Sequence, residues 1–382
     1  MLESIGSFGF GLLIFIILLP PLMFIHELGH FIAAKKAGIR VEEFGMGFPP
    51  RALTLFKRGE TIYTLNWLPI GAFVRMTGEE LPDDPRSFAA QPKRWRFITL
   101  FGGPLMNFIG AFVILVFAYG VLAMVPTEYQ YRIIAINEGS PAAAIGMLPG
   151  DVVLSANGVD LLQRVGQNES LNQSLNTNAL RQQAQASIGK TFTLVVTRAD
   201  AANPAAGRKP ITLSGIIPAD ANRDAPLGIN IGSNILKSER LILNPIQAVT
   251  LATDDMVSTL IGMVRAPIEM ARQKVPLEQA RPVGPLGITK IGVDLVQERT
   301  EQGWFPFVRF AGFLSLALGF TNLLPIPALD GGRIMFILIE WIRGRRVDPR
   351  REQWVHAVGM VMLLGMSAVI VVLDIIKPIS IR

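Results

Sequence analysis

The chain has 382 residues, of which 50% are hydrophobic and only 17% are charged, and its mean hydropathy is +0.40. Soluble proteins average about 25% charged residues, so this composition excludes an ordinary soluble protein and a disordered one. The sequence contains no cysteine, which excludes disulfide scaffolds, thiolate zinc sites and a cysteine nucleophile. The net charge of +6 is compatible with a nucleic-acid partner, with binding to an anionic membrane surface or with basic loops between membrane spans. The distribution of the charge along the chain decides between these three explanations.

Four apolar segments are each long enough for the roughly 20 residues that cross a bilayer core: 8–34, 98–125, 310–329 and 355–376. The predicted fold is therefore a multi-pass α-helical membrane protein with about four transmembrane helices. Residues 1–4 contain no basic side chain, and no small-residue cleavage site precedes the polar motif at 26–30. We therefore expect this span to be retained rather than removed as a signal peptide.

The charged residues are distributed unevenly between these spans. Residues 34–97 carry eleven basic and seven acidic side chains, residues 332–354 carry six and three, and residues 126–303 carry sixteen of each. Basic loops stay on the cytoplasmic side, whereas long domains cross largely regardless of charge. The distribution predicts cytoplasmic loops at 37–97 and 333–354, with the N-terminus and the middle segment extracytoplasmic. A nucleic-acid partner is excluded.

The expected organisation follows from these spans and from the patterns between them. It comprises a first helix at 1–36, a membrane-associated β loop at 37–97, a second helix at 98–125, an α+β domain at 128–232, an amphipathic helical linker at 240–303, a third helix at 304–332, a basic loop at 333–354 and a fourth helix at 355–376.

The middle segment 128–232 has the pattern of a small α+β domain. Short β-branched runs at 132–136, 152–154, 191–197 and 210–217 alternate with turn signals such as Asn157-Gly158. The string at 140–151 resembles part of a PDZ binding loop and its following strand. A PDZ domain holds an extended peptide against a sheet edge, so a peptide or a substrate ectodomain is the expected ligand, with the groove at Ile145, Gly146 and Met147. A small β domain with a chance Gly-Asp turn is the alternative.

Three other segments have weaker patterns. The polar stretch 168–185 is typical of an insertion or loop. Residues 41–76 contain strand-like runs with turns at 45–50 and 58–60, which predicts a hairpin beside the membrane with an unpaired edge. Apolar residues at helical spacing over 245–273 predict an amphipathic helix, either at the membrane surface or buried in the middle domain.

The first span contains the motif His26-Glu27-Leu28-Gly29-His30. On an α-helix, positions i and i+4 lie on one face, so both imidazoles can bind one metal ion while Glu27 acts on a bound water. Zinc is the expected metal, because it binds imidazole and carboxylate and keeps a site for water. Two histidines and a glutamate within a span are costly unless they face a partner or a cavity.

A site of this kind needs a third protein ligand, and Asp330 is the candidate. Pro325 and Pro327 interrupt the helix before it, and an intramembrane aspartate on irregular backbone is tolerated only beside a cavity or a partner. The charge-derived topology places both motifs near the cytoplasmic ends of their helices, so they can meet. His356, at the start of the fourth span, has no ligand-like spacing and is expected to be structural.

These residues resemble the site-2 protease family of intramembrane zinc metalloproteases, through 26–30, 322–332 and Gly103-Pro104-Leu105-Met106-Asn107. The resemblance is closest to bacterial members that act in regulated intramembrane proteolysis and carry a PDZ domain between spans two and three. It implies one zinc ion bound by His26, His30 and Asp330, with Glu27 as general base. It also implies that loop one presents the substrate as an added strand and that further residues bind the substrate, namely Asn322, Pro325, Pro327 and Asn107.

The sequence therefore predicts a zinc endopeptidase of the bacterial cell membrane. Its expected substrates are single-pass membrane proteins, cleaved within transmembrane segments, such as anti-sigma-factor-like proteins or remnant signal peptides. A catalytically inactive, membrane-tethered PDZ adaptor is the alternative, but a protein that only binds has no need of Glu27. A metal transporter would need further intramembrane carboxylates along its path, and Asp374 is alone in the fourth span.

Overall fold

The computed structural model describes residues 2–79, 84–164, 179–199, 207–223, 225–271, 283–297 and 303–376. The chain divides into two compact units. The helical unit comprises residues Met1–Val121, Ile242–Glu298 and Trp304–Ile381, and the β-rich unit comprises Leu122–Leu241.

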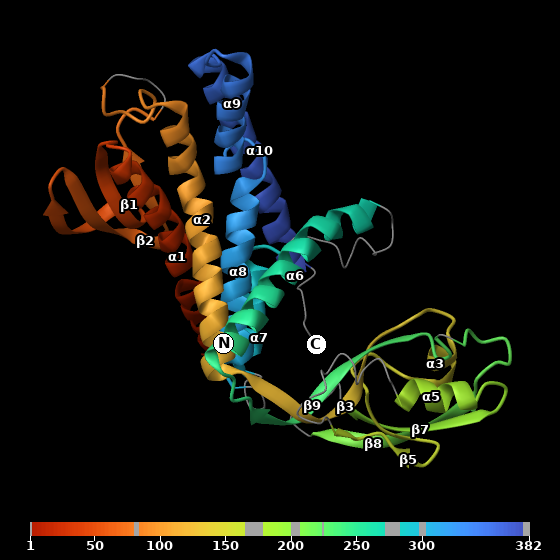
Figure 1. Cartoon of the computed structure of the whole chain (residues 1–382). Helices are drawn as coiled ribbons and strands as arrows, with labels where there is room; N and C mark the ends of the chain where they lie inside the picture. The colour runs from red at the N-terminus through yellow and green to blue at the C-terminus, as the bar shows by residue number, and fades with distance from the viewer. Residues whose placement is uncertain are drawn as a thin grey trace. The chain divides into compact units, whose positions relative to one another are not determined.

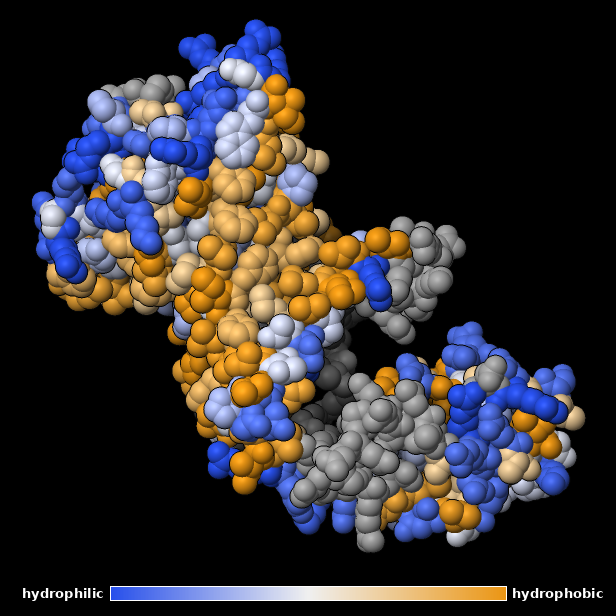
Figure 2. All heavy atoms as spheres, in the orientation of Figure 1, coloured by the Kyte–Doolittle hydropathy of each residue, from blue (hydrophilic) through white to orange (hydrophobic). Residues whose placement is uncertain are grey.

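Four helices of the helical unit are long and apolar enough to cross a membrane: α1 (Leu2–Lys36), α2 (Lys93–Phe117), α8 (Phe305–Leu323) and α10 (Pro349–Ile376). A short π-helix, η1 (Ala118–Leu122), continues α2. The helix α2 packs against both α1 and α8 (Figure 1). Hydrophobic residues cover much of the visible face of this bundle, while hydrophilic ones gather at the end that carries α9 (Figure 2). These four helices correspond to the four predicted spans.

The third span ends earlier than the sequence predicts. The helix α8 stops at Leu323, an irregular segment covers 324–329, and α9 (Asp330–Arg343) begins at the aspartate. The interruption predicted at Pro325 and Pro327 is confirmed, because α8 ends just before them. The bounds predicted for the third span, 304–332, are too long, and the segment predicted as a loop at 333–354 instead contains most of α9. Ile334, Ile337 and Glu340 are buried on one face of α9.

Two further helices belong to the helical unit, α6 (Pro245–Ala271) and α7 (Pro285–Gln297). The α6 carboxylate of Asp255 accepts hydrogen bonds from Arg309 of α8, at 2.6 Å through each carboxylate oxygen, and from Tyr119 of η1 at 3.1 Å. The helix predicted over 245–273 therefore belongs to the helical unit. This excludes the alternative that it is buried in the middle domain. Asp374 of α10 is buried and accepts a hydrogen bond from the backbone of Gly287 at 2.9 Å, which stabilises the first turn of α7.

The hairpin predicted in the first loop is present as β1 (Val41–Arg58) and β2 (Thr61–Met76), an antiparallel pair. Gly59, with φ +59°, lies in the turn that joins them, as the sequence predicts. The turn predicted at 45–50 is confirmed. Residues 43–46 and 51–58 of β1 pair with the same stretch of β2, 61–66, but run along it in opposite directions, so the chain reverses between Met46 and Arg51. Gly47, with φ +79°, lies in this turn.

The β-rich unit contains one seven-stranded sheet with the order β6-β3-β4-β7-β8, in which β5 also pairs with β4 and β9 with β3. Its elements are β3 (Met124–Ile136), α3 (Pro141–Ile145), β4 (Val152–Ala156), β5 (Val159–Asp160), β6 (Gln163–Arg164), α5 (Ala179–Ala186), β7 (Thr191–Ala199), β8 (Arg208–Ile216) and β9 (Ile229–Arg240). All four predicted strand runs lie in strands, apart from the last residue of the fourth run. Asn157 and Gly158 both have positive φ, the conformation of a tight hairpin turn.

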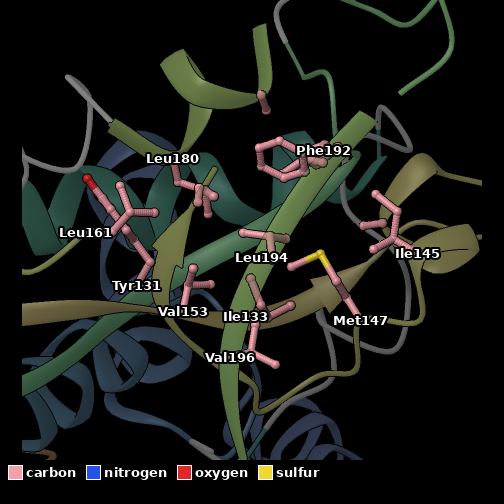
Figure 3. Packing of buried hydrophobic residues seen from close by; sticks show 14 of the residues in the cluster. Tyr131, Ile133, Ile145, Met147, Val153, Leu161, Leu180, Phe192, Leu194 and Val196 are labelled. Atoms are coloured by element: carbon pink, nitrogen blue, oxygen red, sulfur yellow. The ribbon is translucent and has the colours of Figure 1, made fainter. Parts of the chain in front are cut away.

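The core of this unit is apolar and includes side chains from β3, β4, β7 and α5 (Figure 3). Ile145 and Met147 are part of it, with exposed fractions of 7% and 2%, and Gly146 is the left-handed C-cap of α3. These three residues were predicted to line a peptide groove, but burial of the two side chains assigns them to the core instead. In the predicted insertion, 168–178 lie outside the described residues, and 179–185 fall in the helix α5.

Candidate metal centre

The two histidines of the first motif lie on one buried face of α1, with exposed fractions of 9% for His26 and 6% for His30. Their Nε2 atoms are 3.1 Å apart. The helix α2 approaches this face through Gly103, where an added Cβ would overlap the His30 imidazole. A glycine at this position therefore lets the second span pack directly against the two rings.

The carboxylate of Asp330 completes a triangle of donor atoms. Its Oδ2 lies 3.1 Å from His26 Nε2 and 3.4 Å from His30 Nε2. Ligands about 2.0–2.1 Å from a tetrahedral zinc ion are separated by about 3.3–3.4 Å, so the three distances fit one face of such a site. Residues from the first span and from the start of α9, 304 positions apart, are thus brought together as predicted.

The outer nitrogens of both imidazoles are also held. Nδ1 of His30 donates to the backbone oxygen of Thr99 at 2.8 Å, which leaves the Nε2 lone pair for a metal. Nδ1 of His26 lies 3.2 Å from the amide nitrogen of Asn107. Metal binding through Nε2 puts a proton on this Nδ1, and the amide oxygen accepts it after a 180° rotation of the amide. That oxygen is buried and has no partner among the described residues, which fits this arrangement.

The motif glutamate lies beside the triangle. Possible ligand atoms of His26, Glu27 and His30 are all within 4.8 Å of one another. One Glu27 oxygen accepts a hydrogen bond from the backbone N–H of Val74 in β2 at 3.1 Å. The hairpin strand therefore touches the carboxylate directly and restrains its orientation.

The residues expected to bind substrate have different surroundings. Asn107 is fully buried against His26, a place suited to orienting the imidazole rather than touching a substrate. Asn322 lies in the last turn of α8, where its amide donates to the backbone oxygen of Leu318. Pro325 is exposed, and Pro327 lines an apolar groove of about 570 Å³ beside α10.

Three contacts of this centre carry no signal in the sequence. They involve the backbone oxygen of Thr99, the backbone N–H of Val74 and the side chain of His356, which contacts the segment before Asp330. Backbone groups have no side-chain signature, so only the tertiary structure identifies the first two. His356 contacts the backbone of Ala328 and not the donor atoms. A search for ligand-like spacing therefore does not identify it.

The Peptidase family M50 model matches residues 14–366 of the chain. A Clostridium acetobutylicum protein provisionally named a zinc metalloprotease is 30% identical over 97% of this chain and 99% of its own length. Zinc metalloprotease RasP of Shouchella clausii is 27% identical over 97% of this chain and 99% of its own. Regulator of sigma-W protease RasP of Bacillus subtilis is 26% identical over 93% and 96%. With its HExxH histidines and distant aspartate gathered at one buried centre, the chain belongs to peptidase family M50, the site-2 proteases, and is a membrane zinc metalloprotease.

Proposed function

We propose that the chain is an intramembrane endopeptidase that cleaves transmembrane segments of single-pass membrane proteins, with His26, His30 and Asp330 as the zinc ligands and Glu27 as the general base. The observation that carries this proposal is the triangle of donor atoms, 3.1–3.4 Å on each side, formed by residues of membrane-embedded or adjoining elements. Buried polar side chains in a span require such a purpose, since their burial is otherwise costly.

The roles follow from the chemistry of each group. When bound, zinc supplies a Lewis acid that lowers the pKa of a water and polarises the scissile carbonyl. Glu27 takes the proton of the attacking water and delivers it to the leaving amide nitrogen. The Val74 N–H holds one carboxylate oxygen of Glu27, so that proton transfer uses a fixed geometry. Thr99 and Asn107 hold the imidazoles from behind.

Substrate presentation is proposed to involve the hairpin. Since the Val74 N–H points to Glu27, the side of β2 facing away from β1 at this position adjoins the catalytic carboxylate. An extended substrate added along this side would bring its peptide bonds to Glu27. A transmembrane helix must unwind to do so, and Asn322 with the backbone of Pro325 and Pro327 is proposed to hold the unwound segment.

The class of substrate and the orientation of the chain in the membrane are proposed from two separate arguments. The Bacillus subtilis relative is named a protease that regulates sigma-W, which supports anti-sigma-factor-like substrates, with remnant signal peptides as a second group. The basic segments support a cytoplasmic place for 37–97 and 333–354 and an extracytoplasmic β-rich unit in a bacterial cell membrane. We propose that this unit, at 128–232, is PDZ-like and binds a peptide or the substrate ectodomain.

The deciding experiment uses Glu27→Gln in the full chain, reconstituted with a tagged single-pass substrate. General-base catalysis contributes about 10²–10⁴-fold, so cleavage should fall by that factor while zinc content is unchanged. Exposed Asp220→Asn serves as the matched control. Equal cleavage by Glu27→Gln and the wild type would refute Glu27 as the general base, and no cleavage above background by the wild type would favour the inactive adaptor.

A further inference from the structure

The segment that delivers Asp330 to the metal centre has an unusual backbone. Ala328, two residues before the aspartate, has φ +76°, a left-handed conformation that residues other than glycine adopt rarely. Gly331 and Gly332, just after it, have no space for a side chain, because an added Cβ would overlap the backbone of Leu323 and Ile326 respectively. Such a tightly wound segment needs contacts that favour it over ordinary extended or helical backbone.

The fourth span supplies these contacts from two residues about one turn apart. The N–H of Ala328 donates to Nδ1 of His356 at 2.9 Å. Three residues further along α10, Gly359 packs so closely on Pro327 that an added Cβ would overlap it. The His356 ring is itself held beside Phe336 of α9, with 5.5 Å between ring centroids. The helix α10 therefore holds the left-handed residue through one hydrogen bond and its neighbour through close packing.

The hydrogen bond also fixes the form of the His356 imidazole. Because Nδ1 accepts, the proton lies on Nε2. This Nε2 is buried and has no partner among the described residues, and the side chain lines a cavity of about 310 Å³ together with Arg333 and Glu352. A polar cavity of this size has space for a water that accepts the Nε2 proton.

We propose that His356 is a positioning residue of the metal centre. By holding the N–H of Ala328, it keeps 324–329 wound so that Asp330 Oδ2 lies within bonding geometry of the ion bound by the two histidines. The role rests on the proposed assignment of Asp330 as a zinc ligand. It gives α10 a function beyond spanning the membrane, because α10 braces the third ligand.

The test compares His356→Leu, which removes the acceptor, with His356→Asn, whose Oδ1 can occupy the position of Nδ1. Both are made in the full chain, with Val361→Ala as a control on a 70% exposed position of the same helix. The measurements are zinc affinity by chelator competition, the visible absorption of the cobalt-substituted protein, and kcat and KM. Groups that orient a ligand are worth about 10–100-fold in metal affinity or activity, so His356→Leu should lose at least about tenfold in zinc affinity and in kcat.

We expect KM to change little, the cobalt spectrum to shift, and His356→Asn to recover most of the zinc affinity. If His356→Leu fails to accumulate, His356→Gln, whose acceptor lies near Nε2 and not near Nδ1, replaces it in the comparison. Wild-type zinc affinity and cobalt spectrum in His356→Leu, or no recovery in a folded His356→Asn, would overturn the positioning role. Asp330→Ala and Glu27→Gln test the proposed function separately, so failure confined to the His356 variants leaves that function standing.

Discussion

His26 in the helical unit and Leu194 in the β-rich unit are both buried. The contacts that surround these two side chains are of different kinds. Around His26 the contacts are polar, to Asp330, His30 and Asn107. Around Leu194 the cluster is apolar and includes side chains from β3, β4, β7, α3 and α5 (Figure 3). Burial of apolar surface stabilises a fold in proportion to its area, whereas buried polar groups must be matched one by one.

Because of this difference, substitutions in one region should affect mainly function, and substitutions in the other should affect mainly stability. Changes at the metal centre should remove metal and activity while the helices stay packed through contacts such as that between Gly29 and Gly102. Changes in the apolar core should destabilise the β-rich unit and leave the zinc donors in place, because all of them belong to the helical unit.

The largest effect is expected for Asp330→Ala, which removes one corner of the donor triangle. Partners that merely orient a ligand are worth about 10–100-fold, so loss of a ligand should lower zinc affinity by more than about 100-fold. Metal analysis after chelator dialysis measures this, with exposed Asp220→Ala as the control. Stoichiometric zinc in dialysed Asp330→Ala would contradict the ligand assignment.

The next effect is one of stability and lies in the other unit. Leu194→Ala leaves a cavity at a fully buried position, which costs about 2–5 kcal/mol. Thermal unfolding followed by limited proteolysis should show early loss of the β-rich unit with unchanged zinc affinity. Val159→Ala, at a 47% exposed position of the same unit, should have little effect. A drop in zinc affinity with Leu194→Ala would show that the two regions are coupled.

A smaller effect on the metal centre is expected for Asn107→Leu, which removes the partner of His26 Nδ1. Zinc affinity should fall by about 10–100-fold, less than for loss of a ligand. The control is Leu105→Ala on the exposed side of the same helix. If Asn107→Leu reduced substrate affinity without changing zinc affinity, Asn107 would bind substrate, as the family resemblance implies.

The smallest effect concerns the helix α6. Asp255→Asn weakens the paired hydrogen bonds to Arg309, which is half exposed, so the double-mutant coupling with Arg309→Gln should not exceed about 1 kcal/mol. Hydrogen exchange should accelerate over α6 and stay unchanged in the β-rich unit. The neighbouring, exposed Asp254→Asn should leave exchange unaltered, and equal acceleration in both variants would argue against a specific role for Asp255.

Much of the site was predictable because it depends on local geometry. Helical spacing puts His26 and His30 on one face, and an aspartate after two prolines in an apolar segment needs a polar partner. Ile145 and Met147 were misassigned because an apolar side chain in a loop-like string is equally compatible with a groove and a core. The helix α9 was missed because the six basic residues of 332–354 are typical of a loop between spans, and the apolar run at 334–339 is too short to cross a membrane.

The amino-acid sequence by itself determined the four spans, the strand runs of the β-rich unit and the residue types of the zinc donors, since these follow from hydropathy, periodicity and side-chain chemistry. Only the tertiary structure decided which groups hold those donors in place. The Thr99 carbonyl, the Val74 N–H and the His356 ring act through contacts between elements distant in sequence. Two of the three are backbone groups, and no residue pattern can single them out, because every residue provides a carbonyl and every residue except proline provides an N–H.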